Sequence, residues 1–254
     1  MSRLMIRIIF PSLACLLMFC SCSSVGIHSV RSHAVPLQEA PSRIWVERFS
    51  APLSAFQLGE RSAGEKRVLR DEIVTNLARG TAAQLRTHAA DSSVLGTASP
   101  LSPGSWIIRG QIHRVDQGSR ALRASVGLGI GRTEMRTSVA VFKVTGAGLV
   151  PLLRFQTTGS SGMEPGAALG IATGGVGTAL SAASAGGTLL MGSLPGVSTD
   201  IDRTSYEIAA VLSVYLQDNG LLGRSRIPIQ PNMKGQLPTT VNLSRAIPAP
   251  LRAQ

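Results

Sequence analysis

Few residues in this 254-residue chain have the types and spacing that catalysis needs. The run at 159–162, Gly-Ser-Ser-Gly, lacks the G-x-S-x-G spacing that presents a nucleophilic serine. The glycines at 127, 129 and 131 suggest a phosphate loop, but Arg132 stands where the dinucleotide pattern needs glycine. These glycines are better explained by bulges or positive φ at the entry to a strand. The histidines show no metal-ligand spacing: His28, His33, His88 and His113. We therefore predict no enzyme, no metal and no cofactor.

Arginines are the residues best placed to recognise a charged partner. Seven lie in one stretch: Arg109, Arg114, Arg120, Arg123, Arg132, Arg136 and Arg154. The planar guanidinium group matches phosphate and carboxylate geometry. Arg120, Arg123, Arg132 and Arg136 are therefore candidate contacts for lipid phosphates or an acidic partner. The alternative is the solvated face of a sheet, where exposed charges contribute little energy.

A cysteine near the N-terminus is a candidate for covalent modification. Arg3 and Arg7 precede an apolar run at 8–19, which is too short to span a bilayer and is typical of a signal peptide. The following Phe19-Cys20-Ser21-Cys22 resembles a bacterial lipobox, in which the last cysteine becomes lipidated. We predict a lipoprotein signal peptide at 1–21 and a lipid anchor on Cys22. The alternative is a simple secreted protein with a chance cysteine.

The residues after the cysteine and the net charge indicate where the protein acts. Ser23 and Ser24 follow Cys22, rather than the aspartate that retains many lipoproteins in the inner membrane. We expect the outer membrane, facing the periplasm. The net charge is +11, but two arginines leave with the signal and five basic residues lie in the acid-free segment 224–254. With aromatic residues at only 4%, stacking platforms are lacking, so no nucleic-acid partner is expected.

Hydrophobic spacing predicts the elements that position these residues. Ser62 and Glu65 have capping-box spacing, so a helix should begin there and end near His88. A second helix should open at Thr199-Asp200 and close at Asn219-Gly220. Alternation predicts strands at 43–49, 106–115, 133–145 and 149–158. The apolar helix faces should be Leu69, Ile73, Leu77 and Leu85, then Ile201, Ile208, Val211, Leu212 and Tyr215.

The order of these elements predicts an α+β domain, with a small, mostly antiparallel sheet and two helices packed on one face. The domain should span 42–223, with loops at 50–61 and 91–104 and a glycine-rich insert at 160–198. A polar tether at 22–41 precedes it. A Pro-rich, basic tail at 224–254 follows it and is predicted to be disordered and dispensable for folding.

The insert has an unusual composition. Residues 165–199 carry no charge and are dominated by small residues. Gly166, Gly170 and Gly174 would line one stripe of a helix, where they are candidate helix-packing contacts in a membrane or an oligomer. A flexible loop is the alternative, because glycine disfavours helix by about 1 kcal/mol relative to alanine.

Several motifs carry a family resemblance. They are Gly110, the stretch at 118–123 (GSRALR), the run at 127–132 (GLGIGR), the run at 159–162 and the glycine-rich segment with the helix after it. Over roughly 40–222 the chain resembles the bacterial family of domain of unknown function 4410. Members are mostly predicted lipoproteins or exported proteins, and the resemblance implies no activity. We expect a lipid-anchored envelope protein with a non-catalytic interaction domain. The alternative is a self-assembling, pore-like or secretion-channel-like component that uses the glycine-rich segment.

Overall fold

The computed structural model describes residues 25–33, 37–97, 99–118, 133–159 and 195–231. In this part of the chain seven strands form one sheet in the order β1-β7-β6-β5-β2-β4, and β3 also pairs with β5. The strands are β1 (Gly26–Ser32), β2 (Ile44–Val46), β3 (Phe56–Gln57), β4 (Ser92–Val94), β5 (Trp106–Asp116), β6 (Glu134–Thr145) and β7 (Gly148–Gly159). Two long helices are described, α2 (Ala63–His88) and α5 (Pro195–Asp218), together with the short 3-10 helix η2 (Leu53–Ala55).

The sheet is mixed rather than mostly antiparallel. The long strands β5, β6 and β7, with β1 at the edge, pair antiparallel. The short strands β2, β3 and β4 all pair parallel. The prediction of an α+β domain is confirmed, whereas the antiparallel description holds only for the long strands. Strand β2 lies within the strand predicted at 43–49, whereas β3 and β4 were not predicted, because two or three residues are too few to show alternation.

Helix α2 begins and ends where the sequence predicts. The Ser62 hydroxyl accepts a hydrogen bond from the Glu65 N–H at 3.2 Å, and the Glu65 carboxylate accepts one from the Ser62 N–H at 2.9 Å. The Ser62 hydroxyl also donates to the Glu65 carboxylate at 2.8 Å, and this hydrogen bond, with the one from the Ser62 N–H, holds the pKa of Glu65 below its ordinary value. The predicted apolar face of this helix is buried. A capping box therefore fixes the start of the helix, and burial fixes its orientation.

Helix α5 begins earlier than predicted. Its first residue is Pro195, so Thr199 and Asp200 lie inside the helix instead of capping it. The Asp200 side chain is buried and accepts a hydrogen bond from the Thr133 hydroxyl at 2.7 Å. The carboxylate therefore makes a tertiary contact, which its sequence position alone did not reveal. The predicted end is confirmed, because Gly220 has φ 69° and the Leu221 N–H donates to the Leu216 carbonyl at 2.8 Å.

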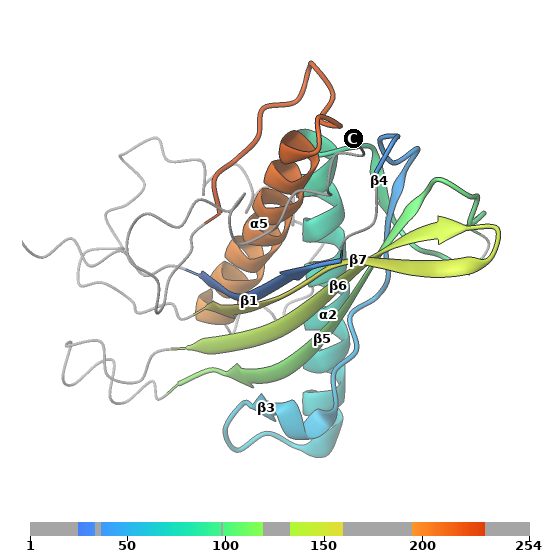
Figure 1. The fold of residues 1–254 in the computed structure, drawn as a ribbon. Helices are drawn as coiled ribbons and strands as arrows, with labels where there is room; N and C mark the ends of the chain where they lie inside the picture. The colour runs from blue at the N-terminus through green and yellow to red at the C-terminus, as the bar shows by residue number, and fades with distance from the viewer. Residues whose placement is uncertain (1–24, 34–36, 98, 119–132, 160–194, 232–254) are drawn as a thin grey trace, which may run out of the picture.

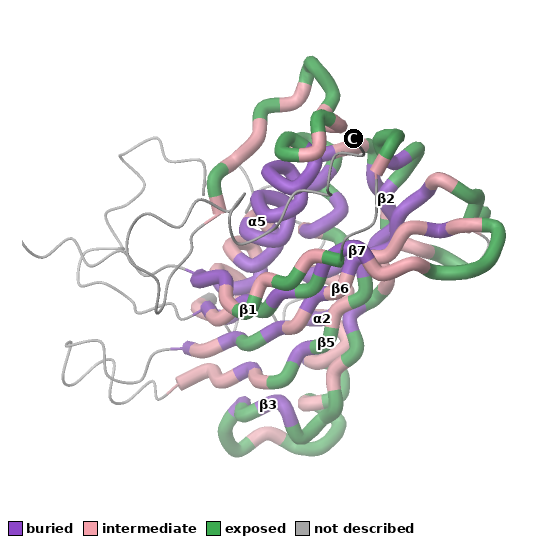
Figure 2. The backbone as a smooth tube through the Cα atoms, in the orientation of Figure 1, coloured by how far each residue is buried: buried purple, intermediate pink, exposed green. Residues whose placement is uncertain are grey.

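Both helices lie on the same face of the sheet, as predicted (Figure 1). They cross closely at Gly80, where an added Cβ would lie 2.7 Å from the Ser205 hydroxyl oxygen. Burial is concentrated where the helices face the strands (Figure 2). The central layer includes Trp106, Ile108, Ile112, Val139, Val141 and Phe155.

The predicted tether at 22–41 contains a strand of the sheet. β1 pairs with β7, and Val25 and Ile27 are buried. A register shift follows His28, and Ser29 adopts φ 53°. This irregularity breaks the two-residue alternation, so the strand pattern was not recognisable in the sequence. The predicted loops at 50–61 and 91–104 likewise contain η2, β3 and β4.

The segment predicted as a disordered tail has described residues at 224–231. They form no helix or strand, but they contact the two helices. Arg226 forms an ion pair with Asp91 at 2.8 Å. The Ile229 N–H donates to the Ser213 hydroxyl at 3.1 Å. The prediction of disorder therefore does not hold for this part of the segment, whereas residues 232–254 and 160–194 lie outside the described residues.

Removing residues from 224 onward should destabilise the domain. The loss of the Ser213 and Arg226 contacts should cost about 1–2 kcal/mol, or roughly 2–8 °C in melting temperature. The matched control is a chain ending at Asn232, which keeps these contacts. Thermal unfolding followed by circular dichroism compares the two. Equal melting temperatures would show that the contacts contribute nothing to stability.

Gly110 on the core face of β5 should tolerate no side chain. A Cβ there would lie 2.0 Å from the buried Phe49 ring. Gly110→Ala should lower the free energy of unfolding by about 1–3 kcal/mol, because the ring must move within a packed core. Gly146→Ala is the control, since nothing lies within 4 Å of its added Cβ. Urea unfolding measures both variants, and equal effects would contradict this account of Gly110.

Candidate functional site

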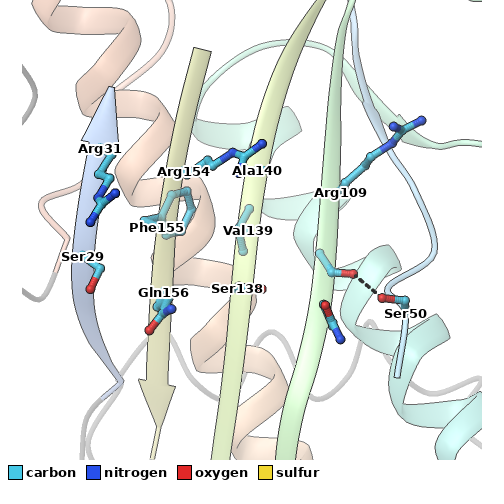
Figure 3. Close-up of a pocket in the computed structure, with 12 residues that line it drawn as sticks. Ser29, Arg31, Ser50, Arg109, Ser138, Val139, Ala140, Arg154, Phe155 and Gln156 are labelled. Atoms are coloured by element: carbon cyan, nitrogen blue, oxygen red, sulfur yellow. Dashed lines mark hydrogen bonds between the residues drawn. The ribbon is translucent and has the colours of Figure 1, made fainter. Parts of the chain in front are cut away.

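The face of the sheet opposite the helices carries a hollow of about 550 Å³. It extends across β1, β7, β6 and β5, and its side chains are mainly arginine, serine and glutamine (Figure 3). Over most of their length the long strands alternate, so most of their apolar residues lie under the helices and their charged residues on this face. Ile107 and Val144 instead form a separate buried cluster with Trp45. His113 of β5 is exposed.

A row of paired residues crosses the hollow. Arg31 of β1 pairs in register with Arg154 of β7, and Arg154 pairs with Ala140 of β6. Ala140 pairs in turn with Arg109 of β5. The small Ala140 side chain leaves room between Arg154 and Arg109, so the surface is hollowed between the arginines of this row.

Arg109 has an acidic partner among the described residues, whereas Arg31 and Arg154 have none there. The Arg109 Nε donates to both Glu47 carboxylate oxygens at 2.9 Å, and its guanidinium lies 5.6 Å from the Phe142 ring centroid. Arg31 and Arg154 are exposed, and neither lies within 4.0 Å of a carboxylate of the described residues. Like charges directly opposite each other on neighbouring strands repel. The β1 side of the hollow is therefore positively charged without an internal counter-charge in the described chain.

A second row supplies neutral hydrogen-bonding groups. Gln156 of β7 pairs with Ser138 of β6, and Ser138 pairs with Gln111 of β5. The Ser138 hydroxyl lies 2.8 Å from the His113 Nε2. At the β5 side, the Ser50 hydroxyl donates to the Gly110 carbonyl at 3.4 Å. These amides and hydroxyls both donate and accept, so the hollow suits a polar ligand with negative charge.

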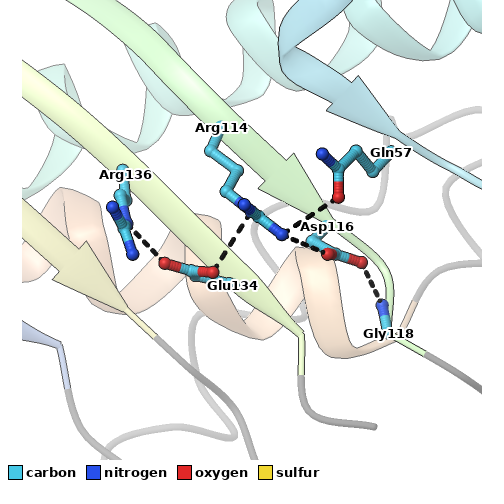
Figure 4. A network of polar contacts seen from close by, with 6 residues as sticks. All are labelled: Gln57, Arg114, Asp116, Gly118, Glu134 and Arg136. Carbon is cyan, nitrogen blue, oxygen red and sulfur yellow. Dashed lines mark hydrogen bonds and ion pairs between the residues drawn. The ribbon is translucent and has the colours of Figure 1, made fainter.

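A separate polar network joins the ends of β3, β5 and β6 (Figure 4). Arg114 donates to Gln57 at 3.0 Å and to Asp116 at 2.9 Å, and it forms an ion pair with Glu134 at 3.2 Å. The hydrogen bond to Asp116 and the charge of Glu134 raise the pKa of Arg114. Arg136 also pairs with Glu134. Of the four predicted partner contacts, Arg136 is thus exposed but already holds an internal acidic partner.

Most of the predicted site residues lie outside the described residues. These are Cys22, Arg120, Arg123, Arg132, Gly166, Gly170 and Gly174. The structure instead brings together Arg31 and Arg154, which are not among the four arginines predicted as partner contacts. Arg31 was assigned to a tether. The alternation of Leu153, Arg154, Phe155 and Gln156 was a usable signal, since it places Arg154 and Gln156 on one face.

No group of three or more His, Cys, Asp or Glu side chains in the described part of the chain is arranged to hold a metal ion. Among the same residues, no helix is both long and apolar enough to cross a membrane.

The fold and the hollow define a small α+β domain whose sheet is covered by helices on one face and exposes a basic, polar hollow on the other. The chain belongs to the family described as Domain of unknown function (DUF4410), whose family model matches residues 44–178. The predicted family membership is confirmed. No curated protein sequence matches the chain.

Two solved structures are similar to part of this chain. One is the PelC dodecamer from Paraburkholderia phytofirmans in space group P6, at 13% identity and a TM-score of 0.33. The match covers 52% of this chain and 82% of that one. The other is a singly substituted PelC dodecamer from the same organism in space group C2, at 11% identity and a TM-score of 0.31. This second match covers 52% of this chain and 79% of that one.

Proposed function

We propose that this chain is a lipid-anchored cell-envelope protein whose folded domain binds another molecule and catalyses no reaction itself. The observation that carries the proposal is the short distance along the chain between the candidate lipid site and the sheet. Only three residues separate Cys22 from Gly26, the first residue of β1. An extended residue spans at most about 3.6 Å, so a lipid on Cys22 would hold this end of β1 within about 14 Å of the bilayer.

Other chain segments leave the sheet at this same end. Gly26 pairs with Thr158, near the last residue of β7. Asp116, the last residue of β5, pairs with Glu134, the first residue of β6. Figure 1 shows β1, β5, β6 and α5 ending or beginning on this side. The proposed anchor therefore defines a membrane-proximal end. The arginines of the hollow begin at Arg31, whose partner Arg154 lies four residues, or about 14 Å, along β7 from the Gly26 partner Thr158.

Replacing Cys22 tests the anchor directly. Cys22→Ala should abolish incorporation of labelled fatty acid and move the protein from the membrane fraction to the soluble fraction, because two acyl chains are needed for stable anchoring. Cys20→Ala is the matched control and should leave labelling unchanged. Sucrose-gradient fractionation of the wild type should place it with the outer membrane. Full labelling of the Cys22 variant would refute the anchor.

The alternative function, self-assembly in the membrane, is favoured by the place of the glycine-rich segment. The uncharged run at 165–199 makes up most of the connection from Gly159, at the end of β7, to α5. Gly159 pairs with Met135 at the same end of the sheet as Gly26, so the segment starts where the membrane would be. An uncharged, small-residue segment at this position suits close packing in lipid.

Gly170→Leu separates assembly from a free loop. If Gly166, Gly170 and Gly174 line a helix packed on a neighbour, leucine has no room, and crosslinked oligomers should be lost while circular dichroism stays unchanged. Gly170→Ala is the milder control and should keep most of the oligomer. Identical crosslinking of the wild type and the leucine variant would exclude this packing and remove the support for a pore-like assembly.

A further inference from the structure

We propose that the hollow on the open sheet face binds an extended acidic segment of a protein partner, with Arg31 and Arg154 as the contacts for its carboxylates. This inference rests on the interaction role proposed above and adds the chemistry of the partner. The site itself consists of described residues, and only the comparison with lipid headgroups uses the proposed anchor on Cys22.

The charge of the arginine pair is not compensated by the described residues. Arg31 and Arg154 are directly opposite on neighbouring strands and repel each other. Arg109, on the same face, shows how this fold compensates an arginine internally, through Glu47 at 2.9 Å. No described carboxylate does this for Arg31 and Arg154. A carboxylate from outside would remove the repulsion and form charge-assisted hydrogen bonds with the two guanidinium groups.

The width and the lining of the hollow suit an extended chain. Four neighbouring strands are separated by three spacings of about 4.8 Å, which gives a width of about 14 Å from β1 to β5. This width accommodates about four residues of an extended chain. Gln156, Ser138 and Gln111 form the neighbouring row and can pair with the amide groups of such a chain. The small side chain of Ala140 leaves room in the hollow for such a chain.

The exposure and the position of the hollow favour a protein segment over a small molecule or a lipid headgroup. Several residues that line the hollow are exposed in the described structure, whereas small-molecule sites usually bury most of their ligand. They include Arg31, Gln111, Arg154 and Gln156. Lipid headgroups are disfavoured by position, because the arginine pair lies about 14 Å along the sheet from Gly26, the end nearest the proposed anchor at Cys22. An extended acidic segment meets both conditions.

The test measures binding of fluorescent poly-L-glutamate to the full-length chain in non-ionic detergent. Arg31→Gln and Arg154→Gln should each weaken binding by about tenfold, the effect of losing one charge-assisted contact. Arg79→Gln is the matched control, since Arg79 is an exposed arginine on α2, on the opposite side of the sheet. It should bind within about twofold of the wild type, as expected for a distant exposed charge.

The outcomes are distinguishable. Equal binding by all four proteins would overturn the proposal, because the attraction would then reflect net charge alone. An absence of binding by the wild type would also overturn it. Mixed micelles containing phosphatidylglycerol should not displace poly-L-glutamate. Displacement that requires Arg31 and Arg154 would assign the hollow to lipid headgroups and also overturn it. Failure of the anchor proposal is seen separately, as labelling that persists in Cys22→Ala with poly-L-glutamate binding unchanged.

Melting temperatures provide the folding control. Neither arginine supports the fold through an ion pair with the described residues, so Arg31→Gln and Arg154→Gln should melt at or slightly above the wild-type temperature. A large fall in melting temperature would show that the pair is structural, and would contradict the assignment of these arginines to a partner.

Discussion

Burial of one face of the sheet under two helices determines which side chains this protein presents to its surroundings. Each long strand alternates, so placing Ile108, Ile112 and Phe155 beneath α2 and α5 forces the residues between them onto the other face. A one-residue shift of any long strand would bury arginine and expose the core. The energy of the core therefore fixes the positions of Arg109 and Arg154 as firmly as it fixes the apolar residues.

Close approaches keep this two-layer arrangement compact. Gly80 lets α2 pass against Ser205 of α5, and Gly110 lets the Phe49 ring lie against β5. The chain after β2 then follows β5, as the hydrogen bonds from the Ser50 N–H to Gly110 and from the Ile112 N–H to Ser50 show. This path covers one edge of the open face and brings Ser50 and Glu47 beside the hollow. At the opposite edge, β1 is the one described element that borders the hollow, and Arg31 and Arg154 are exposed there.

Local patterns in the sequence predicted the elements whose structure depends on neighbouring residues. The capping box of Ser62 and Glu65 fixed the start of α2, and Gly220 fixed the end of α5. The sequence did not predict features that depend on contacts between distant residues. Strand β1 is interrupted at Ser29 and is held by pairing to β7, which lies more than a hundred residues later. Asp200 had the appearance of a helix cap, yet it accepts a hydrogen bond from Thr133. The arginine pair is equally non-local, because Arg31 and Arg154 meet only once β1 is in place.

The central claim is that the open sheet face, and not the helical layer, meets the partner. A photoreactive amino acid at Gln156, an exposed position inside the hollow, tests this claim in intact cells. The same group at Arg79 on α2 reports on the opposite side of the sheet. We expect irradiation to give a discrete heterologous adduct from position 156 and none from position 79, and we expect Arg31→Gln to remove that adduct. An adduct from position 79 alone, or one from position 156 that persists without Arg31, would contradict the account.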